Sequence, residues 1–230
     1  MANPSFAEEP RFGGKRSVFI VDDHPLLRQG LTLLINQQHD LQVIGEAEDA
    51  QTALQAVANR RPDVMIVDIS LAGADGLDLL KNIRTFYGPL PVLILSMHDE
   101  ATYAERALRA GANGYIMKQQ ATEEVLVAMR RILSGGVYLS DRMSNNMLQQ
   151  YVGGAPASAS SRISNLSDRE LEVFGLVGEG RATREIANHL RLSVKTIETY
   201  QAHIKEKLFL RSGRELIQQA IQWRSGDRAV

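Results

Sequence analysis

Apolar and polar positions follow two alternating periodicities between residues 16 and 138. Short, nearly continuous apolar runs predict buried β-strands at Ser17–Val21, Leu41–Ala47, Val64–Asp68, Val92–Ser96 and Gly114–Met117. The stretches between them place apolar residues at helical spacing and predict helices at Leu26–Gln37, Ala50–Arg60, Gly76–Phe86, Thr102–Ala110 and Glu123–Ser134. Strands alternating with helices in this way predict an α/β domain of the flavodoxin-like, doubly wound (βα)5 type, with a parallel sheet covered on both faces.

The pattern changes after residue 138. Residues 153–161 are small and uncharged, which is typical of a linker. Ser167 and Glu170 form a capping box that opens a helix ending near Glu179, and no strand pattern follows. Further helices are predicted near Arg184–Leu190, Val194–Leu208 and Arg214–Trp223. We therefore divide the chain into a disordered tail (1–15), the α/β domain (16–138), a linker with a short helix (139–164) and a small all-α domain (165–230).

Composition adds limits to this picture. Of the 230 residues, 44% are hydrophobic and 23% are charged, as in a soluble globular protein of two domains. No run of about 18 apolar residues and no signal peptide is found, so we expect no membrane contact and a cytoplasmic location. The chain holds no Cys, which excludes disulfides and thiolate metal sites. The net charge is −4 over residues 16–138 and +2 over residues 163–230, a balance too mild to indicate DNA binding by itself.

Reactive side chains follow four of the predicted strands. Asp22 and Asp23 end the first strand, Asp68 the third and Ser96 the fourth, while Lys118 follows the fifth. Because the carboxyl ends of parallel strands share one edge of a sheet, we expect these side chains to converge. Crowded carboxylates favour a hard divalent cation, with Mg²⁺ the usual choice beside phosphate, and a carboxylate is also a nucleophile toward phosphoryl groups.

Several motifs carry a family resemblance: Val21-Asp22-Asp23-His24-Pro25, Asp68 with Asp75-Gly76, Leu95-Ser96-Met97-His98-Asp99, and Gly111-Ala112-Asn113-Gly114-Tyr115-Ile116-Met117-Lys118. With them, residues 16–138 resemble the receiver domains of NarL/FixJ-type response regulators. This resemblance implies that Asp68 accepts a phosphoryl group from a sensor histidine kinase.

The same resemblance assigns roles around Asp68. It implies that Mg²⁺ is bound by Asp23, Asp68 and the backbone carbonyl of Ser70, with Asp22 assisting through water. It also implies that Lys118 and the Ser96 hydroxyl contact the phosphoryl group and that Tyr115 is the switch aromatic. One departure is Ala72, where such receivers usually carry Pro, so we expect a less rigid loop there.

The predicted helix at 194–208 has two distinct faces. Ile197, Gln201, Ile204 and Leu208 fall on one side, and that side is expected to pack on the preceding helices. The opposite side is polar or small and is formed by Lys195, Glu198, Thr199, Ala202 and Glu206. Ser193 is the expected N-cap. Taken alone, this pattern also fits an ordinary amphipathic surface helix.

Residues 165–224 resemble the LuxR-type helix-turn-helix. The matching residues are Leu166 to Val173 (Leu-Ser-Asp-Arg-Glu-Leu-Glu-Val), Glu179-Gly180, Glu185-Ile186-Ala187, Leu190, Leu192 to Ile197 (Leu-Ser-Val-Lys-Thr-Ile), Ile204 and Lys207-Leu208. The resemblance implies binding to double-stranded DNA, with Glu198, Thr199 and Ala202 facing bases and Lys195, Thr196 and Lys205 contacting phosphates. Tyr200 stands where His is frequent, and Glu198 and Ala202 replace common basic residues, so we expect an unusual operator.

We therefore expect a phosphorylation-controlled transcription regulator of a two-component phosphorelay and not an enzyme. We also expect a homodimer in the phosphorylated state, formed through an apolar stripe of Leu216, Ala220 and Trp223 on the last helix. One alternative is an autonomous phosphatase or phosphotransferase using Asp68, against which stands Ser70 where such phosphatases carry a second Asp. Another is a protein-interaction module whose helical domain binds a protein instead of DNA.

Overall fold

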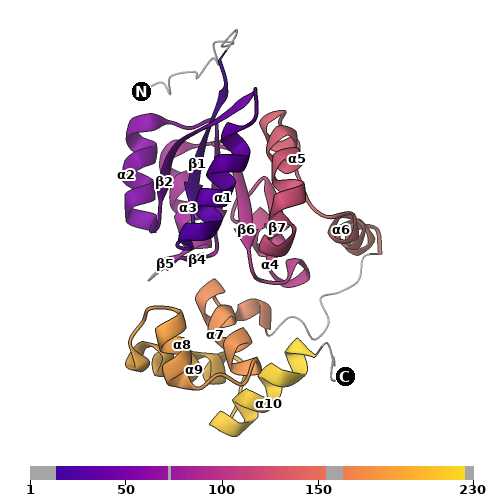
Figure 1. Cartoon of the computed structure of the whole chain (residues 1–230). Coiled ribbons are helices and arrows are strands. Elements are labelled where there is room, and N and C mark those ends of the chain that lie inside the picture. Colours follow the sequence, from indigo (N-terminus) through magenta and orange to yellow (C-terminus); the bar gives the residue numbers. More distant parts are fainter. Residues whose placement is uncertain (1–13, 72–73, 154–162, 226–230) are drawn as a thin grey trace, which may run out of the picture.

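A five-stranded parallel sheet forms the centre of the N-terminal domain in the computed structural model, which describes residues 14–71, 74–153 and 163–225 (Figure 1). The strand order is β2-β1-β3-β6-β7. The bounds are Arg16–Val21 for β1, Leu41–Ala47 for β2, Val64–Asp68 for β3, Val92–Ser96 for β6 and Gly114–Met117 for β7. The predicted doubly wound α/β fold is confirmed, and only the first strand begins one residue earlier than expected.

Helices cover both faces of this sheet. Along β1, Val18 and Ile20 join one hydrophobic cluster, while Phe19 and Val21 join the other. The first cluster lies under α1 and α5, and the second lies under α2, α3 and α4. These helices span Pro25–Asn36 (α1), Ala50–Arg60 (α2), Gly76–Tyr87 (α3), Glu100–Arg109 (α4) and Ala121–Leu133 (α5). The side-chain alternation of a strand therefore divides its apolar residues between two cores.

A short antiparallel hairpin follows strand β3 and was not predicted. It pairs β4 (Ser70–Leu71) with β5 (Ala74–Asp75), and Asp75 then caps α3 by accepting a hydrogen bond from the Leu77 N–H at 2.8 Å. Ala72, the expected departure in this loop, lies outside the described residues. The hairpin fixes the backbone that leaves Asp68.

Only part of the linker and tail can be compared with the structure. The short helix expected in residues 139–164 is α6 (Asp141–Gly153), whose start is fixed where Glu100 accepts a hydrogen bond from the Ser140 N–H at 3.0 Å. Residues 1–13 of the predicted disordered tail and residues 154–162 of the linker lie outside the described residues. Two short 3-10 turns, η1 (Lys118–Gln120) and η2 (Ile163–Asn165), complete this part of the chain.

The C-terminal domain is all-α, as predicted. Its helices are α7 (Asp168–Gly178), α8 (Thr183–His189), α9 (Val194–Lys207) and α10 (Gly213–Arg224). The capping box is present at the start of α7, because Ser167 and Glu170 each accept a hydrogen bond from the other's backbone N–H. In the described part of the chain, no helix is both long and apolar enough to span a bilayer.

The predicted dimer stripe on the last helix is wrong. Leu216 and Ala220 are fully buried inside their own domain, and Trp223 packs on Phe174 of α7 with ring centroids 5.4 Å apart. Gly178 allows this close packing, because a Cβ there would lie 2.6 Å from the carbonyl oxygen of Ala220. Helical periodicity correctly identified a buried face, but that face is used within the domain.

Candidate phosphorylation pocket and nucleic-acid interface

The structure brings the predicted pocket residues together at the carboxyl edge of the sheet. Lys118 Nζ lies 2.6 Å from Asp68 Oδ2 and 2.8 Å from Asp22 Oδ2. Asp22 and Asp68 are buried at the ends of β1 and β3, whereas Asp23 retains some exposure. The strand topology therefore places two buried carboxylates against a single ammonium group, with Asp23 beside them.

This crowding changes the proton affinity of the central carboxylate. Burial, with a smaller contribution from the charge of Asp22, raises the pKa of Asp68 to about 6, although Lys118 acts in the opposite direction. At neutral pH the group is therefore mostly ionised. An ionised and poorly solvated carboxylate is a competent nucleophile, and it also attracts a cation into the pocket.

His24 completes the pocket, and we assigned it no role from the sequence. Its Nδ1 lies 2.9 Å from Asp23 Oδ1 and 3.1 Å from Asp22 Oδ1. Ligand atoms of Asp22, Asp23, His24 and Asp68 all lie within 4.8 Å of one another. Asp23 Oδ1 is buried and, apart from its contact with the His24 ring, accepts no hydrogen bond from any described residue. An unsatisfied carboxylate oxygen in such a cluster fits a divalent cation.

The two predicted switch residues meet at His98. The buried Ser96 Oγ accepts a hydrogen bond from the His98 backbone N–H at 3.1 Å. The Tyr115 hydroxyl donates to the His98 carbonyl oxygen at 2.9 Å, and its ring is buried. Neither side chain contacts Asp68 through a hydrogen bond in this structure. Both instead form hydrogen bonds with the loop that follows β6.

The loop that follows Asp68 also contacts the helical domain. Ser70 donates from its backbone N–H to Asp68 Oδ1 at 3.3 Å and from its hydroxyl to Glu172 Oε1 of α7 at 2.6 Å. The helical domain lies below the carboxyl edge of the sheet, with α7 nearest to it (Figure 1). Sequence reasoning missed Glu172, because its local signal is only that of a polar residue in an amphipathic helix.

A second set of contacts between the domains surrounds Asp168 at the start of α7. Its carboxylate lies 3.1 Å from Lys81 Nζ of α3 and 3.1 Å from Arg106 Nη1 of α4. Arg106 also donates to the carbonyl oxygens of Leu166 and Ile163, at 2.8 and 3.0 Å. These ion pairs are nearer the solvent than Glu172, so each contributes little to the stability of the docked arrangement on its own. Together, however, the contacts around Asp168 favour docking.

Helix α9 shows the two faces expected of it. Ile197 and Ile204 are fully buried, and Ser193 caps the helix by accepting a hydrogen bond from the Thr196 N–H at 3.0 Å. Of the predicted DNA contacts, four are exposed: Lys195, Glu198, Thr199 and Ala202. Thr196 and Lys205 are half-buried at the margins of the same face. The helix therefore presents a polar surface of the size that a major groove admits.

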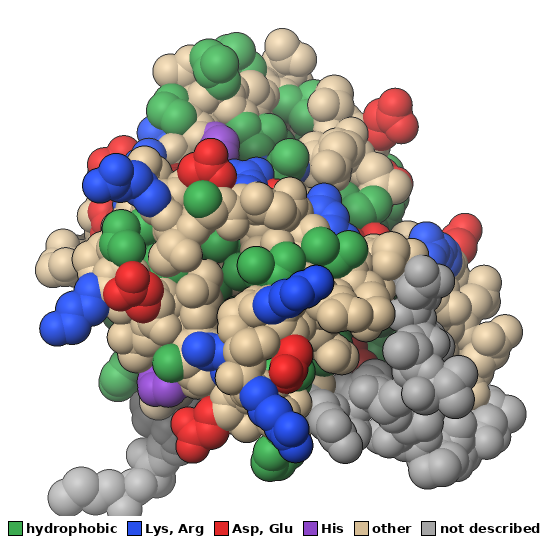
Figure 2. Space-filling view, turned by 90° about the horizontal axis from the view of Figure 1, so that it is seen from below, with side chains coloured by type: hydrophobic (Ala, Val, Ile, Leu, Met, Phe, Trp, Pro, Cys, Tyr) green, Lys and Arg blue, Asp and Glu red, His purple; other side chains and the backbone are tan. Residues whose placement is uncertain are grey.

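Basic side chains on this side of the molecule do not gather into one field. Figure 2 views the helical domain from below and shows Lys and Arg separated by acidic, apolar and uncharged groups. This arrangement agrees with the mild charge balance of the sequence. Affinity for phosphates is consequently expected to depend on a few individual cations.

Comparisons with known proteins cover nearly the whole chain. Residues 18–130 match the response regulator receiver domain, and residues 164–220 match the luxR family of bacterial regulatory proteins. The oxygen regulatory protein NreC of Staphylococcus aureus (strain bovine RF122 / ET3-1) is 35% identical over 209 residues, which cover 89% of this chain and 96% of NreC.

Solved structures agree with this assignment. The RcsB response regulator of Salmonella typhimurium, solved in work on conformational dynamism for DNA interaction, has a TM-score of 0.63 at 25% identity and covers 91% of this chain and 98% of its own. A structure of two RcsB dimers bound to two parallel DNAs has a TM-score of 0.55 at 26% identity, covering 89% and 97%. The chain therefore belongs to the two-component response regulators of the NarL/FixJ type, DNA-binding transcription factors in which a receiver domain is joined to a LuxR-type helix-turn-helix domain.

Proposed function

We propose that phosphorylation of Asp68 by a sensor histidine kinase controls DNA binding by this regulator. The observation that carries the proposal is the pocket itself, in which a buried, ionised Asp68 lies 2.6 Å from the Lys118 ammonium group. In the reaction, a carboxylate oxygen of Asp68 attacks phosphorus, and the bond from phosphorus to the donor imidazole breaks. The products are an acyl phosphate on Asp68 and a neutral histidine on the kinase.

The pocket fits Mg²⁺ as its resident ion. Asp22, Asp23, Asp68 and the backbone carbonyl of Ser70 would hold it, and the buried, unsatisfied Oδ1 of Asp23 supports this choice. When bound, the ion supplies positive charge that stabilises the phosphoryl oxygens. Lys118 supplies further positive charge at the same place. The Ser96 hydroxyl would turn from His98 toward a phosphoryl oxygen, and Tyr115 would then change its contacts.

For DNA, we propose that α9 enters the major groove. Glu198, Thr199 and Ala202 occupy its exposed face, where side chains reach base edges, and Lys195, Thr196 and Lys205 at its margins would contact phosphates. Thr199 already donates its hydroxyl to the carbonyl oxygen of Lys195 at 2.9 Å. Its methyl group is therefore the feature left for a base, and thymine carries a matching methyl in the major groove.

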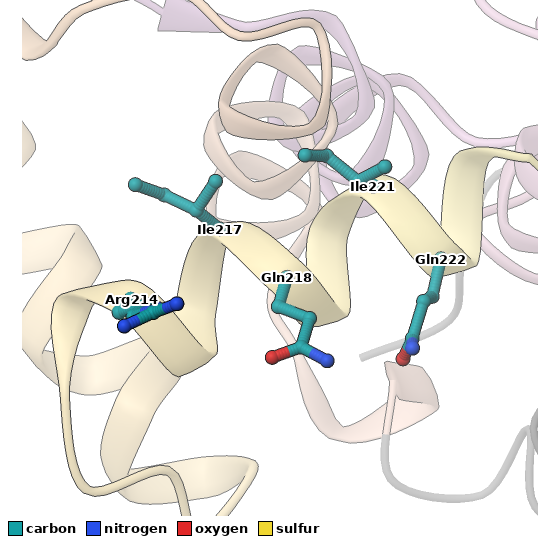
Figure 3. A pocket seen from close by; sticks show the side chains of 5 residues that line it. All are labelled: Arg214, Ile217, Gln218, Ile221 and Gln222. Carbon is teal, nitrogen blue, oxygen red and sulfur yellow. The ribbon is translucent and has the colours of Figure 1, made fainter.

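We further propose that the phosphorylated protein binds DNA as a homodimer through α10. Ile217 and Ile221 lie one turn apart on the same side of this helix (Figure 3), and they are 49% and 48% exposed. They line a shallow hollow together with Arg214, Gln218 and Gln222. A second copy of the chain would cover these isoleucines. The similar regulator RcsB has been solved as dimers bound to DNA.

Phosphorylation is tested by incubating the full chain with acetyl phosphate and Mg²⁺ and weighing the intact protein. One phosphate should be gained, and Asp68→Asn should lose it. Asp99→Asn is the matched control, because Asp99 is an exposed acidic residue at the same edge of the sheet that caps α4. Asp23→Asn should instead weaken Mg²⁺ binding, since one anionic ligand is lost. A phosphate retained by Asp68→Asn would refute the assignment.

A further inference from the structure

Ser70 joins the phosphoacceptor directly to the DNA-binding domain. Its backbone N–H donates to Asp68 Oδ1, and its hydroxyl donates to Glu172 Oε1, a residue 102 positions away. The same residue supplies the carbonyl group that is expected to bind the metal. A change at Asp68 therefore reaches Glu172 through one intervening residue.

His98 forms a second connection to the same carboxylate. Its Nε2 lies 2.9 Å from Ser70 Oγ and 3.6 Å from Glu172 Oε1, and its ring stacks on Tyr103 with centroids 4.4 Å apart. The backbone N–H of His98 donates a hydrogen bond to Ser96 Oγ, and its carbonyl oxygen accepts one from the Tyr115 hydroxyl. Ser96 and Tyr115, the two residues expected to respond to a phosphoryl group on Asp68, are thus connected to Glu172 through His98.

Glu172 is sensitive to these contacts because it is buried. Its side chain is 2% exposed, and its remaining partner is Arg169 of the same helix. A buried carboxylate that loses hydrogen-bond donors costs free energy unless it returns to water. Return to water requires α7 to leave the receiver domain. The docked state is therefore less stable once Ser70 and His98 leave their present positions.

We propose that the contact of Ser70, His98 and Glu172 is the element through which phosphorylation of Asp68 releases the DNA-binding domain. This inference rests on the proposed phosphorylation. When the Ser96 hydroxyl turns to the phosphoryl group, the His98 N–H loses its acceptor and the loop that carries the imidazole moves. The carbonyl group of Ser70 would help to hold the metal in the same state. Glu172 loses both donors from the receiver domain, and docking weakens.

The ion pairs at Asp168 also join the two domains and serve as a control for the Glu172 contact. Lys81 and Arg106 lie on α3 and α4, and Lys81 pairs with Asp78 and Asp168, neither of which belongs to the acidic pocket. Breaking them should weaken docking in both states alike. Breaking the Glu172 contact should weaken docking in the unphosphorylated state and remove the response to phosphate. Only a difference between the two states transmits a signal.

The test measures the distance between the domains in the full chain by electron spin resonance. The chain holds no Cys, so Gln51→Cys in α2 and Gln219→Cys in α10 place one exposed label on each domain. Phosphorylation with acetyl phosphate and Mg²⁺ should raise the ratio of undocked to docked molecules about tenfold. In Glu172→Gln the ratio of undocked to docked molecules should already be higher than in wild type before phosphorylation. It should then change less than about twofold on phosphorylation. Lys81→Gln should also start high but keep the roughly tenfold response.

Ser70→Ala is the second variant and tests the same contact from the receiver side, with the result expected for Glu172→Gln. Intact mass, measured on the same samples, separates the two proposals. Wild-type protein that gains no phosphate on Asp68 would overturn the proposed function and this inference with it. Phosphorylated Glu172→Gln that retains the full tenfold response would overturn this inference alone, as would an equal loss of response in Lys81→Gln.

Discussion

The carbonyl oxygen of Asp68 occupies the space next to Gly76 so closely that a Cβ at position 76 would lie 2.0 Å from it. The same Cβ would lie 2.8 Å from the Cα of Ile69. The Gly76 N–H donates to the Ile69 carbonyl oxygen at 2.7 Å, so α3 begins directly against the backbone of Asp68 and Ile69. Both contacts are with backbone atoms, which cannot rotate away.

Gly76→Ala should therefore displace the backbone that positions Asp68. We expect the variant to lose roughly 1–3 kcal/mol of unfolding free energy and most of its phosphorylation by acetyl phosphate. Denaturant unfolding and intact mass measure the two effects. Gly30→Ala is the control, because Gly30 is exposed in α1 and a Cβ there would meet nothing within 4 Å. It should be as stable as wild type or gain up to about 1 kcal/mol. Full phosphorylation of Gly76→Ala would contradict the geometry.

The acidic pocket could be located from the sequence because two regular patterns determine it. Nearly continuous apolar runs define the parallel strands; Asp68 ends one of them, and Asp22 and Lys118 stand immediately after two others. The topology of a parallel sheet then places their side chains at one edge. No long-range information beyond the strand order is needed, which is why the predicted residues are found together.

The contact between the domains and the use of α10 could not be predicted in the same way. Periodicity shows that Leu216 and Ala220 share a face with Trp223, but not whether α7 or a second chain covers that face. Glu172 meets Ser70 only because two separately folded domains are placed against each other. No pattern within either domain encodes that placement.

Asp75 predicts a dependence of stability on pH. Burial, with the charges of Asp168 and Glu172, raises the pKa of Asp75 from 3.8 to about 7 in the folded protein. The unfolded chain therefore releases this proton first, and stability falls as pH rises from about 4 to about 7, by up to about 4 kcal/mol. Asp75→Asn keeps an oxygen that accepts from the Leu77 N–H and removes the charge. The variant should be more stable than wild type at pH 8, and the two should converge near pH 4 in denaturant titrations. Equal stability at pH 8 would contradict the prediction.

The position of Arg191 leads us to expect that the DNA-binding domain and the metal compete for Asp23. Its guanidinium Nη2 lies 3.9 Å from Asp23 Oδ2, and its backbone has a φ of 51°, a conformation that Asn adopts readily. Arg191→Asn should therefore preserve the turn before α9 and remove a cation from the pocket. Because the pair is exposed, we expect Mg²⁺ affinity to rise only about two- to fivefold, and less at high salt. Calorimetric Mg²⁺ titrations measure this, with Arg184→Asn on the exposed surface of α8 as control. An equal rise in the control would indicate a general effect of net charge.

The exposed isoleucines of α10 predict a specific defect in dimer formation. Ile217→Asp and Ile221→Asp place a charge where a second copy would bury an apolar surface, and neither residue belongs to the core of its own domain. Thermal unfolding should be nearly unchanged, whereas the phosphorylated variants should protect one half-site instead of two spaced by about one helical turn of DNA. Gln219→Glu adds a charge at another exposed position of the same helix and should keep both half-sites. Two protected half-sites in Ile221→Asp would refute this dimer surface.

Thr199 allows the base-reading face of α9 to be tested with changes of single atoms. Its hydroxyl is engaged with the Lys195 carbonyl oxygen, so we expect its methyl group to contact a thymine methyl. Thr199→Val keeps a methyl group at that place and should retain sequence preference. Thr199→Ser keeps the hydroxyl and should lose about 1–3 kcal/mol of discrimination at one base pair. Lys195→Ala should instead weaken binding to all sequences alike and reduce the salt slope by about one unit. Binding isotherms on single-base operator variants at two salt concentrations separate these results. If Thr199→Val changes preference as much as Thr199→Ser, the hydroxyl and not the methyl group reads the base, and the orientation inferred for this side chain on DNA is wrong.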